Sequence, residues 1–137
     1  MQPRLLHSLL WDLDPMVKGT FVENVPWVKV ILGYGRSIQA PFLVLDTGFT
    51  GDIQVTSKIA TELGLKVTGI SPTRIANGQI VQMPSALAIA AMEGRTKVIE
   101  VLISDSMPLA GISFLAKFSY KATVDCKNKT VTLERMV

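Results

Sequence analysis

Glycine-centred turns separate short apolar runs along most of this chain, and this alternation constrains the fold more than any other feature of the sequence. The dipeptide Asn77-Gly78 stands between residues 73–76 and 79–83, two runs that carry Ile, Val and Thr. Asn and Gly both tolerate positive φ, which the tightest β-turns require. The dipeptide therefore predicts a tight hairpin that projects from the rest of the domain.

Similar strand and turn patterns recur on both sides of this hairpin. We predict three further strand pairs. Residues 26–32 pair with 40–45 around a turn at 33–37, and residues 86–92 pair with 96–103 around a turn at 93–95. The third pair joins residues 120–126 with 130–134. A hydroxyl residue, Thr56, and a glycine, Gly64, delimit one short helix. Seven or more strands with one or two short helices indicate an all-β fold. The 137 residues, 48% of them hydrophobic, are enough for one sizeable core.

The first fifteen residues follow a different pattern. Their leucines recur at three-to-four residue spacing and are Leu5, Leu6, Leu9, Leu10 and Leu13. This spacing predicts a short amphipathic helix that packs on its own barrel or on a partner chain. Asp12 and Asp14 stand where a secretory signal would carry small residues, so we do not interpret the segment as a signal peptide. We divide the chain into an N-terminal extension, residues 1–20, and one domain, residues 21–137.

Charge and cysteine content exclude several classes of function. The net charge is +3, and the Lys and Arg residues are scattered, whereas nucleic-acid binding usually needs a concentrated basic surface. Cys126 is the single cysteine, which excludes an intrachain disulfide and a cysteine-based metal site and favours a cytoplasmic location. The longest uncharged apolar stretch, residues 86–92, is far shorter than a membrane span. We therefore expect neither nucleic acid nor a membrane as a partner.

One apolar strand ends on an acid. Val44 and Leu45 lead directly into Asp46, which is followed by Thr47 and Gly48. A strand rich in Phe, Leu and Val is expected to be buried, and an ionisable group at its end needs partners or has a chemical role. Asp46 is therefore the first candidate for a functional residue.

The chain resembles the retroviral-type, or retropepsin-like, aspartic proteases and their bacterial single-domain relatives. The resemblance spans about residues 26–134. The shared features, in order, are Asp46-Thr47-Gly48 after an apolar run, a glycine-bearing hairpin at 75–83, and an apolar-Gly segment at 109–111 before a helix at 112–116. Phe49 and Gly51, which extend the motif to Asp-Thr-Gly-Phe-Thr-Gly, look like the bacterial branch. This resemblance implies a closed all-β barrel with one lobe per chain.

The resemblance also implies an aspartic endopeptidase that hydrolyses polypeptides without a metal or another cofactor. In such enzymes two carboxylates share one proton, so that one activates water and the other polarises the scissile carbonyl. Thr47 would fix the geometry of the turn and Gly48 would permit close approach. This chain has one Asp-Thr-Gly motif, so the second carboxylate is expected from a homodimer in which Asp46 meets Asp46 of the second chain. Asp52 is a competing partner within the chain, although a polar residue beyond the loop is the simpler interpretation.

By order along the chain, the hairpin at Ala76, Asn77 and Gly78 corresponds to the flap that closes over peptide in this family. An ordinary surface hairpin is the alternative, and the sequence does not decide between the two. Two departures stand out, because retroviral members carry an acid and an arginine where this chain has Thr50 and Ile112. Since both members of that pair are missing together, we expect a different buttress for the active-site loop.

Two other functions remain open. Phe49 stands where smaller residues are usual, and its ring would narrow the cleft. This departure and the missing pair favour a catalytically silent, protease-like module for dimerisation or peptide binding. An unrelated small β-barrel binding module is the third interpretation, and it requires the order of motifs to be a coincidence.

Overall fold

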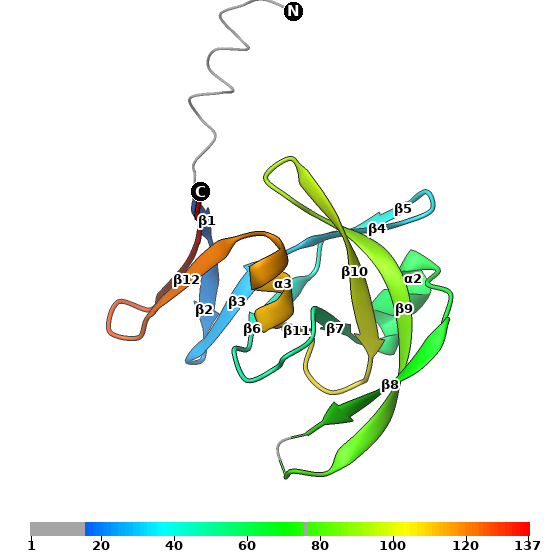
Figure 1. The fold of residues 1–137 in the computed structure, drawn as a ribbon. Helices are drawn as coiled ribbons and strands as arrows, with labels where there is room; N and C mark the ends of the chain where they lie inside the picture. Colours follow the sequence, from blue (N-terminus) through cyan, green and yellow to red (C-terminus); the bar gives the residue numbers. More distant parts are fainter. Residues whose placement is uncertain (1–15, 76) are drawn as a thin grey trace, which may run out of the picture.

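The computed structural model describes residues 16–75 and 77–137. The strands of this part of the chain are β1 Met16–Lys18, β2 Thr20–Val22, β3 Val25–Lys29, β4 Ile31–Tyr34, β5 Ser37–Gln39, β6 Phe42–Leu45, β7 Ile53–Val55, β8 Gly69–Arg74, β9 Ile80–Met92, β10 Arg95–Ile103, β11 Leu109–Ala110, β12 Tyr120–Asp125 and β13 Thr130–Arg135. Its helices are α2 Ser57–Leu63 and α3 Ile112–Lys117. The all-β class predicted from the turn pattern is confirmed (Figure 1).

The larger sheet is curled into a half-barrel. Its strand order is β2-β3-β6-β11-β7-β10-β9-β4-β5, and β8 pairs with β9 outside this path. Only Val30 separates the end of β3 from the start of β4, although these strands stand near opposite ends of that order. A sheet whose two ends are joined by one residue has to curl, and the right-handed twist of strands favours the same curvature.

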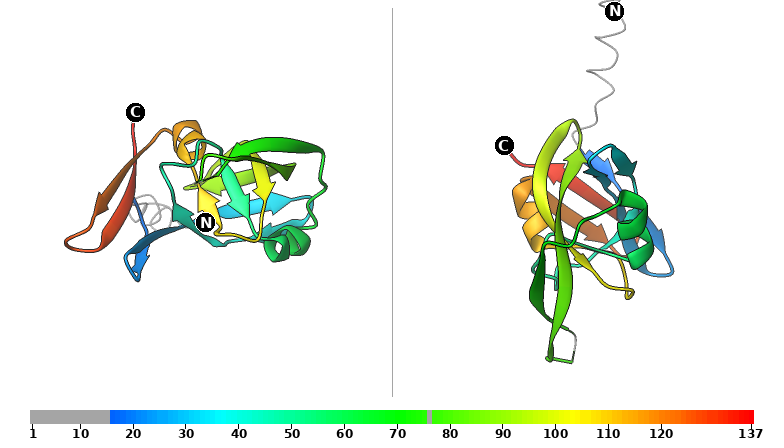
Figure 2. Two further views of the ribbon diagram at one scale, coloured as in Figure 1. Left: turned by 90° about the horizontal axis from the view of Figure 1, so that it is seen from below. Right: turned by 90° about the vertical axis from the view of Figure 1, so that its right-hand side faces the viewer.

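A smaller sheet holds both chain ends of the described structure. Its order is β1-β13-β12, all antiparallel. The amide of Gly19 donates to the Val131 carbonyl at 2.8 Å, which continues the pairing beyond β1. In Figure 1 this sheet lies on the opposite side of the molecule from the β8–β9 hairpin, and Figure 2 shows the hairpin extending away from the body of the lobe.

The core lies inside the curl and is closed by the two helices. Fully buried side chains include Val28, Leu32, Leu43, Ile99 and Phe114. Burial of each such side chain stabilises the fold by about 1.5–3 kcal/mol. Helix α2 contributes Ala60 and Leu63 to this core, and α3 contributes Phe114 and Leu115.

Helix α2 has the boundaries that the sequence predicts. Thr56 is its N-cap, and the Thr56 hydroxyl accepts a hydrogen bond from the Ile59 amide at 3.3 Å. Gly64 ends it in the left-handed region with φ +70°. A side-chain acceptor at the start and a glycine after the last turn satisfy backbone groups that a helix otherwise leaves unpaired.

Three details differ from the sequence-based expectation. The strand expected at 26–32 is interrupted at Val30, because β3 pairs with β6 whereas β4 pairs with β5 and β9. At the Asn77-Gly78 turn only Gly78 has positive φ, +86°. The Ile75 amide donates to the Gln79 carbonyl and encloses a three-residue loop, with its last residue in the left-handed region as in common three-residue hairpins.

The third difference concerns the start of the domain. The helix predicted for residues 1–15 lies outside the described residues. Met16–Lys18 and Thr20, which we grouped with the extension, are part of β1 and β2 instead. Strand pairing therefore already includes residue 16. Neither helix of the described part combines the length and the apolar character that a membrane crossing needs.

Candidate active site

Asp46 is placed by strands that are distant in sequence. Strand β11 lies between β6 and β7, parallel to β6 and antiparallel to β7. The loop from Asp46 to Asp52 joins β6 to β7 and therefore passes over the end of β11. The Asp46 amide continues the β6–β11 ladder, donating to the Ala110 carbonyl at 3.0 Å. The backbone of the acid is thus anchored in a parallel pair at the centre of the sheet.

The carboxylate of Asp46 is held within its own turn. The Gly48 amide donates to Asp46 Oδ1 at 2.9 Å, and the Phe49 amide donates to the Asp46 carbonyl at 3.1 Å. A Cβ on residue 48 would lie 3.2 Å from the same Oδ1, so glycine suits this close approach. Asp46 is half-buried, and Thr47 and Gly48 are exposed beside it. The arrangement presents an oriented carboxylate at a surface.

Two glycines make room for the ring of Phe49. A Cβ on Gly51 would lie 2.6 Å from Phe49 Cζ, and a Cβ on Gly111 would lie 2.3 Å from the Gly51 carbonyl oxygen. The Ile112 amide donates to the Phe49 carbonyl at 2.9 Å, so the start of α3 is bonded to the loop that it supports. The loop and the helix start are therefore in direct backbone contact.

Phe49 belongs to a small apolar cluster beneath the projecting hairpin. It is only 8% exposed and packs with Met83 of β9 and Leu102 of β10, and Ile75, Val81 and Leu109 flank the cluster. The ring thus packs between the active-site loop and the hairpin strands, and Phe49 is among the residues that line the cleft.

A cleft of about 970 Å³ opens in front of Asp46. Its wall comes from the active-site loop, from the β8 side of the hairpin and from β10. The lining residues of the active-site loop include Asp46, Gly48, Phe49 and Thr50, and those of the hairpin are Ser71, Pro72, Thr73, Arg74, Ile75 and Met83. The hairpin predicted from Asn77-Gly78 is therefore a wall of the Asp46 cleft.

The hairpin tip itself contributes less than the sequence suggests. Asn77 and Gly78 are exposed and are not among the residues that line the cleft, and Ala76 lies outside the described residues. The tip is closed by local bonds, from the Gln79 amide to Asn77 Oδ1 at 2.9 Å and from the Arg74 guanidinium to the Gly78 carbonyl at 3.1 Å. The strand that leads to the tip, rather than the tip, faces the cleft in this conformation.

Two further polar residues of the cleft, Gln54 and Glu100, were not identified from the sequence. Gln54 is buried, and its side-chain amide donates to Ser106 Oγ at 3.0 Å and to the Met107 carbonyl at 2.9 Å. Glu100 of β10 lies along the same cleft and is exposed. The alternation of polar and apolar residues along β10 is visible in the sequence and predicts a strand with two different faces. It does not indicate which face of β10 lies toward the loop after Asp46.

Asp52 does not lie free beyond the loop. It is 5% exposed, and its Oδ2 accepts hydrogen bonds from Lys117 Nζ at 2.6 Å and from the Glu100 amide at 2.9 Å. Asp52 therefore faces α3 and β10. Two other acids are bonded elsewhere. Asp105, after β10, accepts from the Ser57 amide at the start of α2, and Asp125, at the end of β12, accepts from the amides of Lys127 and Asn128.

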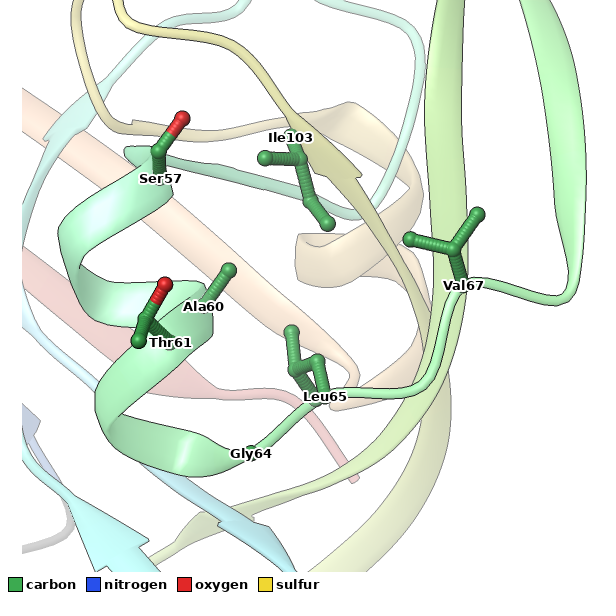
Figure 3. A pocket seen from close by; sticks show the side chains of 7 residues that line it. All are labelled: Ser57, Ala60, Thr61, Gly64, Leu65, Val67 and Ile103. Atoms are coloured by element: carbon green, nitrogen blue, oxygen red, sulfur yellow. The ribbon is translucent and has the colours of Figure 1, made fainter.

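A second pocket lies beside α2 and shares no lining residue with the Asp46 cleft. It measures about 420 Å³ and is lined by Ser57, Ala60, Thr61, Gly64, Leu65, Val67 and Ile103. Figure 3 shows Ala60, Leu65 and Ile103 around the gap between the helix and β10. This lining holds two hydroxyl groups and no ionisable side chain, so we assign it no chemistry. Among the described residues, no group of three or more His, Cys, Asp or Glu side chains is arranged to hold a metal ion.

The arrangement of these strands is found in solved structures. The crystal structure of a retropepsin-like aspartic protease from Rickettsia conorii superposes with a TM-score of 0.62, covering 88% of this chain and 91% of that one at 17% sequence identity. The chain has a retropepsin-like fold. EIAV protease complexed with the inhibitor HBY-793 matches with a TM-score of 0.55 and 18% identity, covering 70% of this chain and 89% of the viral one.

The retropepsin-like fold is evident from structure alone. No protein-family model matches the sequence, and no curated protein matches it. At this level of identity the likeness establishes the retropepsin-like lobe and no more.

Proposed function

We propose that this chain is a homodimeric aspartic endopeptidase that hydrolyses peptide bonds with water activated between Asp46 and Asp46 of a second chain. The observation that carries the proposal is the position of Asp46, whose carboxylate accepts from the Gly48 amide and lines a cleft of about 970 Å³. The retropepsin-like fold supports the proposal, and in this chain Asp46 follows the end of β6 as a half-buried residue beside exposed Thr47 and Gly48. The chemistry needs two such carboxylates, and one chain provides one Asp-Thr-Gly motif.

A two-fold dimer is the simplest way to bring two identical groups together, because residues on the symmetry axis face their own copies. Thr47 is exposed next to Asp46. We assign Thr47 and Gly48 to the support of the active-site loop, Gly48 through the amide that donates to Asp46 Oδ1. In this dyad one Asp46 is the base that activates water, and the other is the acid that polarises the scissile carbonyl.

The β8–β9 hairpin is proposed as the flap, with Ala76, Asn77 and Gly78 at its tip. Its strand already lines the cleft, and closure over a bound polypeptide would exclude water from the dyad. The extension before β1 is proposed as a separate element from this protease domain. We propose a cytoplasmic location, since the exposed Cys126 makes no demand on an oxidising compartment.

The test is cleavage of a mixed peptide library from acidic to neutral pH. We expect wild-type protein to cleave and Asp46→Asn to be silent at the same dimer content, measured by sedimentation. Asp125→Asn is the matched control, because Asp125 lies half-buried at the end of β12 and outside the cleft, so its replacement should leave cleavage unchanged. Cleavage by a strict monomer, or cleavage that survives in Asp46→Asn, contradicts the proposal.

A mixed dimer sharpens this test. One wild-type chain and one Asp46→Asn chain, purified with two different tags, share a single dyad. If the dyad is shared, the mixed dimer loses nearly all activity, whereas independent sites would keep half. Silence of the wild type against the whole library would favour the catalytically silent peptide-binding module instead.

A further inference from the structure

A buried ion pair joins the active-site loop to α3. Asp52, at the end of that loop, and Lys117, in the last turn of α3, are 65 residues apart in sequence and 2.6 Å apart in the structure. The Asp52 side chain is 4% exposed and that of Lys117 is 40% exposed. A carboxylate this deeply buried is stable as an ion only with strong partners.

Three elements meet at one oxygen of this carboxylate. Asp52 Oδ2 accepts from Lys117 of α3 and from the Glu100 amide of β10, and it belongs to the segment that leads from Asp46 into β7. Asp52 Oδ1 is buried and makes no hydrogen bond within residues 16–75 and 77–137. Removal of Lys117 would thus leave a buried charge with one amide as its bonding partner among these residues.

The same junction is bonded through the backbone to Asp46. The Gly111 amide donates to the Asp52 carbonyl at 2.9 Å, and the next amide but one, of Ser113, donates to the Gly51 carbonyl at 3.3 Å. Gly111 follows Ala110, whose carbonyl accepts the Asp46 amide. A shift of α3 against the loop therefore moves the strand to which Asp46 is bonded.

We propose that Asp52 and Lys117 are a positioning pair that sets the place of the Asp46 carboxylate relative to the dimer axis. This inference rests on the proposed function and adds the buttress that the site requires. The Asp52–Lys117 pair joins the loop to α3 in a chain that has Thr50 and Ile112 in place of the acid and the arginine of the retroviral proteases. Lys117 acts through Asp52 and the loop, without contact with the reacting atoms.

The first variant is Lys117→Met, which keeps the stem of the side chain and removes the charge. We expect kcat per folded dimer to fall about 10- to 100-fold with KM changed by less than about 2-fold, because displacement of a reacting group by about 1 Å costs rate on this scale. Lys117→Arg restores the charge and should recover most of kcat. Lys58→Met, at an exposed lysine of α2, is the matched control and should change neither parameter.

A double variant separates positioning from stability. Asp52→Asn with Lys117→Met removes both charges, and neutral replacement of a buried pair often restores stability that the single change loses. We expect the melting temperature of the double variant to approach that of the wild type while kcat stays low. Recovery of kcat together with the melting temperature would show that the pair is merely structural and would overturn the proposal, as would an unchanged kcat in Lys117→Met.

An independent readout distinguishes failure of this inference from failure of the proposed function. Backbone amide resonances of Asp46, Gly48 and Gly111 should shift in Lys117→Met, and Lys117→Arg should return them toward their wild-type positions. If the wild type cleaves nothing and these resonances shift, the protease proposal fails and the positioning of the loop is supported. If the resonances do not move, the positioning role is refuted whether or not the protein cleaves peptides.

Discussion

Gly111 is the position at which a single methyl group should do most damage to the site. A Cβ there would lie 2.3 Å from the Gly51 carbonyl oxygen, 2.6 Å from the Phe49 carbonyl oxygen and 2.7 Å from Phe49 Cδ2, whereas ordinary contact begins at 3.4 Å. Two backbone carbonyls of the active-site loop must therefore retreat by about 1 Å, more than a side-chain rotation can absorb. The Phe49 carbonyl accepts a hydrogen bond from the Ile112 amide, so its movement would weaken that bond.

We expect Gly111→Ala to lower the free energy of unfolding by about 3 kcal/mol, from overpacking together with a weakened hydrogen bond. For a domain of this length that corresponds to a melting temperature lower by about 10 °C, measured by calorimetry at fixed protein concentration. Turnover by the remaining folded dimer should fall as well, because the loop that moves carries Asp46.

Gly33→Ala is the control for this prediction. A Cβ at Gly33 meets its nearest neighbour, the Ser37 carbonyl oxygen, at 3.8 Å, which is an ordinary contact. We expect its melting temperature to stay within about 2 °C of the wild type, since a fitting alanine costs little. A Gly111→Ala protein that melts like Gly33→Ala and cleaves like the wild type would refute the packing of the loop against the start of α3.

Two further predictions concern turns. Gly78→Pro should reduce peptide turnover with little change in melting temperature. Gly78 has φ +86° and its amide donates to the Ile75 carbonyl at an exposed tip, and proline allows neither the positive φ nor the hydrogen bond. Gly35→Pro, at the exposed β4–β5 turn with φ +58°, is the control, and an equal loss of turnover in this variant would reject a flap role for the β8–β9 hairpin. The backbone hydrogen bond from Ser57 lowers the pKa of Asp105 below its ordinary 3.8, so the stabilisation is present above pH 3.8 and is lost as the pH falls through the folded-state pKa. Asp105→Asn should therefore show a smaller drop in melting temperature between about pH 6 and pH 3 than the wild type; an identical drop would show that this carboxylate does not contribute.

Local signals in the sequence predicted most of the secondary structure. A hydroxyl before and a glycine after residues 57–63 defined α2, and the Asn77-Gly78 pair located the hairpin that became a wall of the cleft. These features depend on backbone preferences within a few residues, which are legible without tertiary structure. The type of turn was less legible, because the φ that Asn77 adopts depends on the strand pairing around it.

The residues around Asp46 show where sequence reasoning ends. The apolar strand, the acid and the following glycine were sufficient to nominate Asp46 as the candidate functional residue. The interpretation of Asp52 as a simple polar residue failed to find its partner, because nothing in the chain near Asp52 points to a lysine 65 residues later. Gln54 and Glu100 were missed for the same reason.

The sequence by itself determined the all-β class, the turns, the capped helix and the identity of the acid at the end of β6. Only the tertiary structure decided which strands lie beside that acid, which charge neutralises Asp52, and which face of the hairpin lines the cleft. Turn and cap preferences are short-range properties of the backbone. The curl of the sheet, by contrast, brings β11 between β6 and β7 and α3 against the loop, and those contacts form only when distant apolar residues are buried together.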